Sequence, residues 1–316
     1  MAVGARTSGG LLKVRALETG SRVALVAPAS PFVREAFDAG CRELERLGLR
    51  AVFDDTVFTP GPIVAGPPAV RADAFRRMWM RDDVDAVMAV RGGYGSMELL
   101  PLLTPAVFRQ KPIPFIGYSD TTALHIWLNG HVGITSVHGA MIDGRLALGD
   151  SAYDVRTFIA SLGDQPIGEL CPDGLEVLRA GEASGPLVGG TLTQLCASLG
   201  TPYDFRPPAG AVVFIEEVGE RPYRLRRMLA QLRQSGRLAG VAALVFGQLP
   251  RCDETDGRVT ARDVIAAFAA ECPGPVLFGF PSGHTTTPLL SLPLGGRARV
   301  LATGRPALVL EEAVAE

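Results

Sequence analysis

The stretch Phe115-Ile116-Gly117-Tyr118-Ser119-Asp120-Thr121-Thr122 is an apolar run that reaches a glycine, places a serine at a bend and continues as a helical pattern. A strand that runs straight into a helix holds such a serine on a tight, strained turn, with its hydroxyl beside the first N–H groups of the helix. The stretch therefore predicts an α/β fold with a nucleophile at Ser119. A plain helix cap, with Ser119 or Asp120 accepting from the first-turn amides, explains the same residues and stays open.

The four histidines help to decide between these alternatives, because a hydrolytic serine needs an imidazole that accepts its proton. His125 lies on the helical pattern that follows the serine, and His131 stands at a polar helix end, so both are interpreted as structural or solvated. His138 follows an apolar run and is kept as a neighbour of the site. His284 is the predicted base, since it follows the strand-like run 276–280 in a loop, and open α/β sheets place their chemistry at the carboxyl ends of strands. A loop histidine without a role is the alternative.

An orienting acid is predicted at the end of another apolar strand. Residues 211–215 form a buried-type run that closes on Glu216 and Glu217, an unusual end for such a strand. Because side chains alternate along a strand, only one of the two carboxylates can reach the histidine from it. Glu216 is the predicted partner of His284, and Glu217 is the alternative.

These residues belong to a series of motifs that follow one another along the chain. The motifs are Arg91-Gly92-Gly93-Tyr94-Gly95, Gly117-Tyr118-Ser119-Asp120-Thr121-Thr122, Val137-His138-Gly139, Leu187-Val188-Gly189-Gly190, Phe214-Ile215-Glu216-Glu217-Val218-Gly219-Glu220 with Tyr223 and Arg227, and Gly279-Phe280-Pro281-Ser282-Gly283-His284. In this order they resemble the serine LD-carboxypeptidases, a family that includes muramoyl-tetrapeptide carboxypeptidase and the microcin-immunity peptidases. The resemblance covers residues from about 23 to about 310.

The resemblance implies a role for each matching position. Ser119 would be the nucleophile, His284 the general base and Glu216 its orienting partner. The backbone N–H groups of Gly93 and Asp120 would form the oxyanion hole, because a glycine turn and a helix N-terminus favour a developing negative charge. The candidates for substrate binding are Gly92, Tyr94, His138 and Thr191.

The chain departs from the family pattern at two positions. Glu217 stands where an Asp is common in relatives, which conserves the charge. Thr191 stands where many relatives have Asn, which can alter a hydrogen bond that positions the substrate or the interdomain hinge. The fine choice of substrate is therefore left open.

The alternation of strand-like and helical patterns predicts a two-domain α/β protein with mostly parallel pairing. We expect an N-terminal nucleophile domain over residues 12–155, a linker with a hairpin over 156–186, and a C-terminal domain carrying the Glu and the His over 187–312. The resemblance adds a flavodoxin-like, class I glutamine amidotransferase-like N-terminal domain, a swivelling β/β/α C-terminal domain and a homodimer. The site would lie at the domain interface, and a loose linker could hold His284 away from Ser119 until substrate closes the domains.

Composition disfavours several classes of function. The 316 residues are 47% hydrophobic and 20% charged with a formal net charge of −2, which gives no basic footprint for nucleic acid. Five scattered cysteines without Cys-x-x-Cys spacing, and the lack of His-Glu-x-x-His, predict neither a disulfide framework nor a metal site. No apolar run approaches about 20 residues, and the first ten residues lack an apolar core, so a cytoplasmic protein without membrane segments is expected.

By resemblance, the chain would hydrolyse the L,D-peptide bond before the terminal D-alanine of cytoplasmic muropeptide tetrapeptides, in cell-wall recycling, through an acyl-enzyme and without a cofactor. A microcin-immunity-type peptidase that cleaves aminoacyl-nucleotide conjugates is the alternative enzyme. Such a peptidase would need an aromatic side chain on which the nucleobase stacks. Trp79 and Trp127 lie in helical patterns and are interpreted as packing residues. A noncatalytic peptide-binding protein is the alternative of another class, although a receptor has no need of the three catalytic residue types together.

Overall fold

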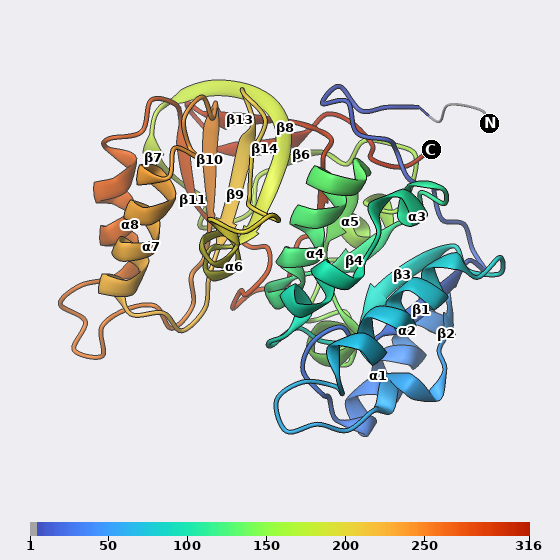
Figure 1. The fold of residues 1–316 in the computed structure, drawn as a ribbon. Helices are drawn as coiled ribbons and strands as arrows, with labels where there is room; N and C mark the ends of the chain where they lie inside the picture. Colours follow the sequence, from blue (N-terminus) through green and yellow to red (C-terminus); the bar gives the residue numbers. More distant parts are fainter. Residues whose placement is uncertain (1–4) are drawn as a thin grey trace.

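The computed structural model describes residues 5–316 and folds them around two β-sheets (Figure 1). The first sheet has the strand order β12-β5-β4-β3-β1-β2. Its strands are β1 (Arg22–Val26), β2 (Arg50–Val52), β3 (Ala86–Ala89), β4 (Phe115–Gly117), β5 (Ser136–His138) and β12 (Leu292–Leu294). Strands β1 to β5 are parallel and β12 is antiparallel to β5. The order 2-1-3-4-5 of the parallel strands is that of flavodoxin, as predicted.

Helices surround this first sheet, on the right in Figure 1. They are α1 (Arg34–Arg46), α2 (Pro68–Met80), α3 (Pro105–Arg109), α4 (Thr122–Trp127) and α5 (Val155–Ala160). Helix α2 has a proline at its first position, where the missing N–H leaves no intrahelical bond unmade. Trp79 and Trp127 are fully buried against Phe108, with ring centroids 5.0 and 4.9 Å away. Both tryptophans are therefore packing residues, as the helical patterns predicted.

The second sheet has the order β6-β14-β13-β8-β9-β10-β11-β7 and lies on the left in Figure 1. Its strands are β6 (Gly168–Leu170), β7 (Glu176–Arg179), β8 (Gly181–Thr191), β9 (Val212–Glu216), β10 (Ala243–Gly247), β11 (Val276–Phe280), β13 (Arg297–Ala302) and β14 (Ala307–Leu310). The neighbouring strands β8, β9, β10 and β11 are parallel. Helices α6 (Leu192–Ser198), α7 (Pro222–Gln234) and α8 (Ala261–Ala269) pack on one face of them.

Alternation along β9 divides the second unit into two cores. Val213 and Ile215 belong to the core beneath α6, α7 and α8, whereas Val212 and Phe214 belong to the core on the opposite face with β13 and β14. Because both faces of these parallel strands are covered, their sequences are continuous apolar runs and not alternating ones. The predicted two-domain α/β fold is confirmed at this level.

The predicted domain boundaries differ from the structure. Residues 156–186 were predicted as a linker, but they contain most of α5, the strands β6 and β7, and the beginning of β8. Gly163 and Gly174 lie in a bend and a turn next to the short edge strands of the second sheet, whereas Gly168, Gly181, Gly185 and Pro186 lie within strands. The range 187–312 also contributes β12 to the first sheet, and Val14 bridges to Ala315. The chain therefore crosses between the two units more than once, so they are joined by more than a single hinge.

Candidate active site

The predicted elbow is present at the end of β4. Ser119 has a φ of +65°, a left-handed conformation that non-glycine residues adopt rarely and at a cost of order 1–3 kcal/mol. The serine opens a 3-10 turn, Ser119–Thr121, that continues directly into α4. Its side chain is half-buried. The strand, the bend and the helix thus hold the hydroxyl on a strained turn, which a plain helix cap does not require.

The turn that follows β3 lies against this serine. A Cβ added to Gly92 would lie 2.9 Å from Ser119 Cβ, 3.1 Å from Ser119 Oγ and 3.4 Å from the backbone nitrogen of Asp120, so only glycine fits there. The next residue, Gly93, is exposed, and its N–H donates no hydrogen bond within residues 5–316. Asp120 is the second residue of a three-residue helical turn, and its N–H therefore precedes the first intrahelical bond. Both amides are available to a developing oxyanion.

The side chain of Asp120 anchors the elbow on two sides. Its Oδ2 accepts from the N–H of Ser96 at 2.8 Å, and its Oδ1 accepts from Nε2 of Gln194 on α6 at 3.2 Å. The carboxyl is only 3% exposed, and burial raises its pKa although the hydrogen bonds from Ser96 oppose the rise. The elbow is thereby tied to the turn after Gly93 and also to the second unit.

His284 and Glu216 form a hydrogen-bonded pair, as predicted. Oε2 of Glu216 accepts from both the backbone N–H and Nδ1 of His284, each at 2.8 Å. Oε1 accepts from the hydroxyl of Thr191, at the end of β8. Gly283, with a φ of +72°, packs so closely that a Cβ there would lie 2.6 Å from Cδ of Glu216. The fully buried carboxylate is therefore fixed by three donors, and it leaves Nε2 of His284 available for a reaction.

The electrostatics of this pair favour the ionised carboxylate. Burial alone would raise the pKa of Glu216, but the adjacent His284 lowers it to a net value below the ordinary one. Burial alone would lower the pKa of His284, but the charge and hydrogen bond of Glu216 raise it to a net value above the ordinary one. The imidazole is thus a stronger base than a free histidine.

The predicted nucleophile, Ser119, and the predicted base, His284, come from different units of the structure. The ring of Tyr118, the residue before the nucleophile, lies 5.2 Å from the ring of His284 between centroids. Within residues 5–316, no hydrogen bond joins Ser119 Oγ to His284. Catalytic hydrogen bonds are often long without substrate and shorten in the complex. Closure on the substrate stays a prediction.

Glu217 lies on the other side of β9 from Glu216, as strand alternation predicted. It accepts from the N–H and the hydroxyl of Thr193 at 2.8 and 2.7 Å, and from the N–H of Val218 at 2.9 Å. Burial raises the pKa of this carboxyl. Glu217 therefore supports the start of α6 and makes no hydrogen bond to His284 in residues 5–316.

Two of the predicted substrate-binding residues lie behind the pair and not at the surface. His138 is 0% exposed, and its Nδ1 lies 3.3 Å from the hydroxyl of Ser282. Burial lowers the pKa of His138 to about 4, so its ring is neutral at pH 7. Thr191 is 5% exposed and holds Glu216. Both residues thus contact the pair or its loop from inside the protein, and their part in substrate binding stays a prediction. Gly92 is buried against the nucleophile, and Tyr94 is 55% exposed beside the predicted oxyanion turn.

The remaining histidines have structural positions, as predicted. His125 is buried, with Nδ1 2.8 Å from the hydroxyl of Ser136 and Nε2 2.9 Å from the carbonyl oxygen of Gly117. His131 packs on Tyr203, with ring centroids 5.6 Å apart.

Gln248 was missed by the sequence analysis. It lies at the end of β10, donates to the Thr287 hydroxyl at 3.0 Å and accepts from the N–H of Thr286 at 2.8 Å, beside His284. Its only signal was a polar residue at the carboxyl end of an apolar strand.

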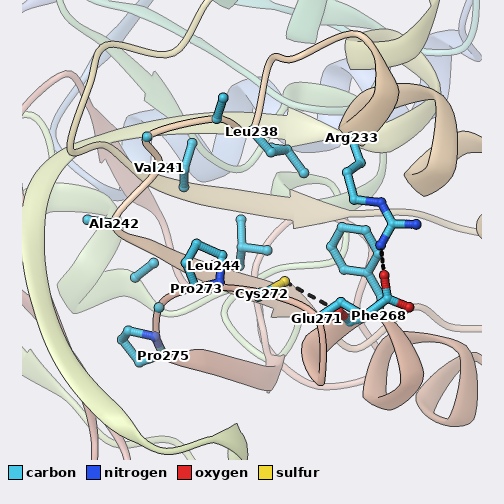
Figure 2. Close-up of a pocket in the computed structure, with 14 residues that line it drawn as sticks. Arg233, Leu238, Val241, Ala242, Leu244, Phe268, Glu271, Cys272, Pro273 and Pro275 are labelled. Atoms are coloured by element: carbon cyan, nitrogen blue, oxygen red, sulfur yellow. Dashed lines mark hydrogen bonds and ion pairs between the residues drawn. The ribbon is translucent and has the colours of Figure 1, made fainter.

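A separate apolar pocket of about 250 Å³ lies at the opposite end of β10 (Figure 2). The side chains that line it include those of Val241, Leu244, Phe268 and Cys272. Arg233 and Glu271 form an ion pair at its rim. Because reactions in open α/β sheets occur at the carboxyl ends of strands, this pocket lies at the wrong end of the strand for the chemistry predicted at Ser119.

In residues 5–316 no helix is long and apolar enough to span a bilayer, and no group of three or more His, Cys, Asp or Glu could hold a metal ion.

Comparisons with known proteins agree with this arrangement. The family model of the LD-carboxypeptidase N-terminal domain matches residues 23–139, and that of the LD-carboxypeptidase C-terminal domain matches residues 184–300. A murein tetrapeptide carboxypeptidase of Pseudomonas aeruginosa is 30% identical, over 83% of this chain and 88% of its own length. The crystal structure of muramoyltetrapeptide carboxypeptidase from Oxalobacter formigenes matches with a TM-score of 0.80 and 27% identity, over 93% of this chain and 99% of that one.

The microcin C7 self-immunity protein MccF in its apo state matches with a TM-score of 0.88, over 95% of this chain and 99% of that chain. At 22% identity this likeness shows the fold alone. The two family models together cover most of the described chain; the first range includes Ser119 and the second includes Glu216 and His284. The chain belongs to the LD-carboxypeptidase family, peptidase family S66, and is an enzyme of the carboxypeptidase class.

Proposed function

We propose that this enzyme is a serine LD-carboxypeptidase that removes the terminal D-alanine from muropeptide tetrapeptides. The observation that carries the proposal is the strained Ser119 at the end of one sheet, next to Tyr118, whose ring lies 5.2 Å from that of His284 in the His284–Glu216 pair of the other sheet. The names of the relatives, murein tetrapeptide and muramoyltetrapeptide carboxypeptidase, support this substrate class.

The first half of the reaction forms an acyl-enzyme. Nε2 of His284 accepts the proton of the Ser119 hydroxyl, and Oγ attacks the carbonyl carbon of the L,D-peptide bond. The N–H groups of Gly93 and Asp120 donate to the resulting oxyanion, and each such donor contributes on the order of a hundredfold or more in rate. The C–N bond then breaks, and His284 returns its proton to the nitrogen of the departing D-alanine.

The second half releases the acyl group. A water molecule enters the place of D-alanine and gives a proton to Nε2 of His284 as its oxygen attacks the ester carbonyl. The tetrahedral intermediate collapses, and the proton returns to Ser119 Oγ. Throughout, Glu216 holds the imidazole by Nδ1 and stabilises its charged form.

A cytoplasmic role in cell-wall recycling and a homodimer are parts of the proposal that rest on the family resemblance. Cell fractionation and light scattering test them separately from the chemistry. The similarity in fold to MccF supports the microcin-immunity alternative. However, Trp79 and Trp127 are both buried, so neither offers a surface on which a nucleobase could stack.

The test is chiral detection of free D-alanine after incubation of the purified enzyme with the diaminopimelate tetrapeptide. Ser119→Ala removes the nucleophile, and Ser235→Ala, a substitution at the end of α7, is the matched serine control. A tetrapeptide ending in L-alanine tests the L,D requirement. We expect D-alanine from the wild type and Ser235→Ala, none from Ser119→Ala and no release of L-alanine.

Two results would contradict parts of the proposal. If the wild type reacts with a serine-directed acylating probe but releases no D-alanine, the muropeptide assignment is wrong and aminoacyl-nucleotide conjugates are tested next. If the wild type neither reacts with the probe nor releases D-alanine, the proposed triad is wrong and peptide binding without turnover is measured by calorimetry.

A further inference from the structure

Arg145 joins the nucleophile unit to the loop that carries the base. It lies in the turn Ile142–Leu146, which follows β5 of the first sheet. Its Nη2 donates to the carbonyl oxygen of Thr285 at 2.8 Å and approaches that of Gly283 at 3.4 Å, and its Nη1 donates to the carbonyl oxygen of Ala152 at 3.1 Å. Gly283 and Thr285 are the residues on either side of His284. One guanidinium therefore holds the backbone on both sides of the proposed base.

Within residues 5–316 the charge of Arg145 has no carboxylate partner. Among residues 5–316, none of the ion pairs includes this arginine, and its hydrogen bonds all go to backbone carbonyls. Burial raises the pKa of the Tyr118 hydroxyl and the Arg145 charge opposes that rise, so the guanidinium also lies close to the residue before the nucleophile. A half-buried guanidinium with planar, fixed donors suits a geometric role.

The same turn is fixed to the predicted oxyanion side of the site. The N–H of Asp143 donates to the carbonyl oxygen of Val90 at 2.8 Å, and its Oδ2 pairs with Arg91 at 2.8 Å. Arg91 directly precedes Gly92 and Gly93. The turn thus contacts the glycine turn through Asp143 and the base loop through Arg145.

The base loop also contacts the nucleophile unit through side chains, since the hydroxyl of Ser282 lies 3.3 Å from Nδ1 of His138 on β5. It leaves β11 of the second sheet and enters β12 of the first, and between them Leu289 bridges to Tyr153. From its own unit it is held by Glu216 and Gln248. Arg145 is the residue of the nucleophile unit whose side chain donates directly to the backbone around His284.

We propose that Arg145 is a positioning residue that sets the distance between His284 and Ser119 across the two units. The inference rests on the proposed triad and adds a residue to it. Reacting groups must meet within a few tenths of an ångström, and a misplacement of about 1 Å can cost on the order of a hundredfold in rate. Without the guanidinium, the imidazole stays paired with Glu216 but its position relative to the nucleophile is no longer fixed.

The experiment compares Arg145→Met with the wild type and with Arg109→Met. Methionine keeps an unbranched apolar stem and removes all donors. Arg109 also donates to a backbone carbonyl of the first unit, that of Val132 at 2.6 Å, but beyond the far end of α4. The measurements are kcat and KM for release of D-alanine from the tetrapeptide, the rate at which an acylating probe labels Ser119, and the Tm of each variant.

We expect Arg145→Met to lower kcat about 30- to 100-fold with KM changed less than about threefold, and to slow probe labelling in parallel. Arg109→Met is expected to keep the wild-type kcat. An unchanged kcat in folded Arg145→Met, or a rise in KM alone, overturns the proposal; the second result would show that Arg145 binds substrate.

If Arg145→Met does not fold, Arg145→Lys provides the test. Lysine keeps the positive charge but lacks the planar guanidinium that donates to several carbonyl oxygens at once. We therefore expect a kcat that is lower than that of the wild type but still measurable. A folded Arg145→Lys with the wild-type kcat overturns the positioning role. Failure of the proposed function looks different, because the wild type itself would then release no D-alanine.

Discussion

The proposed nucleophile and its proposed base are held in different ways. Ser119 stands between β4 and α4, so consecutive residues determine its backbone and its positive φ. His284 and Glu216 are 68 positions apart in the chain and meet because β9 and β11 both neighbour β10 in the second sheet. The carboxyl ends of parallel strands lie at the same edge, which brings the two side chains together.

This difference shows which part of the site is sensitive to distant changes. The elbow is a local turn packed beneath Gly92 with one hydrogen bond from the second unit, that of Gln194 to Asp120, whereas the base depends on contacts from β8, β9, β10 and the first unit. Substitutions that leave the Ser119, Glu216 and His284 side chains unchanged should therefore affect catalysis more often when they lie around His284 than when they lie around Ser119. The predictions below test that expectation.

The largest effect is expected at the paired carboxylates. Glu216→Gln removes the charge that orients and stabilises the imidazolium, and comparable changes in hydrolytic triads cost about 10⁴-fold in kcat. Glu217→Gln alters the neighbouring carboxyl, which hydrogen-bonds Thr193 and not His284. We expect kcat to fall about 10³- to 10⁴-fold in Glu216→Gln and less than about tenfold in Glu217→Gln, measured by D-alanine release. Equal losses would assign the wrong carboxylate to the histidine.

The next effect is expected at the glycine turn on the nucleophile side. A Cβ at Gly93 would lie 2.4 Å from the Ser30 hydroxyl, on a backbone with a φ of +101°. Gly93→Ala should displace the proposed oxyanion donor and lower kcat on the order of a hundredfold. Gly200 has a φ of +78° with open space around it, so Gly200→Ala introduces backbone strain without a collision. A kcat in Gly93→Ala that equals that of Gly200→Ala would remove Gly93 from the oxyanion hole.

The fold and the catalytic residue types could be predicted from sequence where the signal is local. The run before Ser119 and the alternation at Glu216 and Glu217 each lie within a few consecutive residues, and the structure places all three side chains as that alternation and bend require. The family resemblance supplied the oxyanion turn, whereas the place of His284 in a loop after an apolar strand indicated the base before the resemblance was considered.

The missed features depend on pairing between distant segments. Strands β6 and β7 have three and four residues and lie at sheet edges, too short to show a period, so their glycines and prolines indicated a linker. Strand β12 crosses to the first sheet, and no local pattern specifies that partner. The contact of Thr191 with Glu216 joins two neighbouring strands that are separated in the chain, and no local pattern predicts it.

The pH dependence of activity tests the electrostatics of the base. Burial lowers the pKa of His284, and the charge of Arg145 lowers it further. The charges of Glu216 and Glu217 raise the same pKa, and its net value lies above the ordinary one. Since a general base must be neutral, kcat/KM should increase with pH through a pKa above the ordinary value of about 6.5, and should be at least about tenfold below its plateau at pH 5.5. In Glu216→Gln the residual activity should titrate at lower pH, because the carboxylate that raises the pKa is gone. A wild-type acid limb below pH 6 would show that the pair is not coupled in solution.

The smallest effect is expected at Thr191, whose hydroxyl donates to Oε1 of Glu216. Thr191→Val keeps the β-branched shape but leaves that buried oxygen without its donor, at a cost of about 1–3 kcal/mol in the free energy of unfolding. The other oxygen still holds His284 through two hydrogen bonds, so kcat should fall only several-fold. Thr191→Ser restores the donor and should recover kcat and the free energy of unfolding together, measured by D-alanine release and urea denaturation. If Thr191→Val loses as much activity as Glu216→Gln, the base side depends on Thr191 as strongly as on the carboxylate; if it loses none, Glu216 is fixed by His284 and the close packing of Gly283 alone.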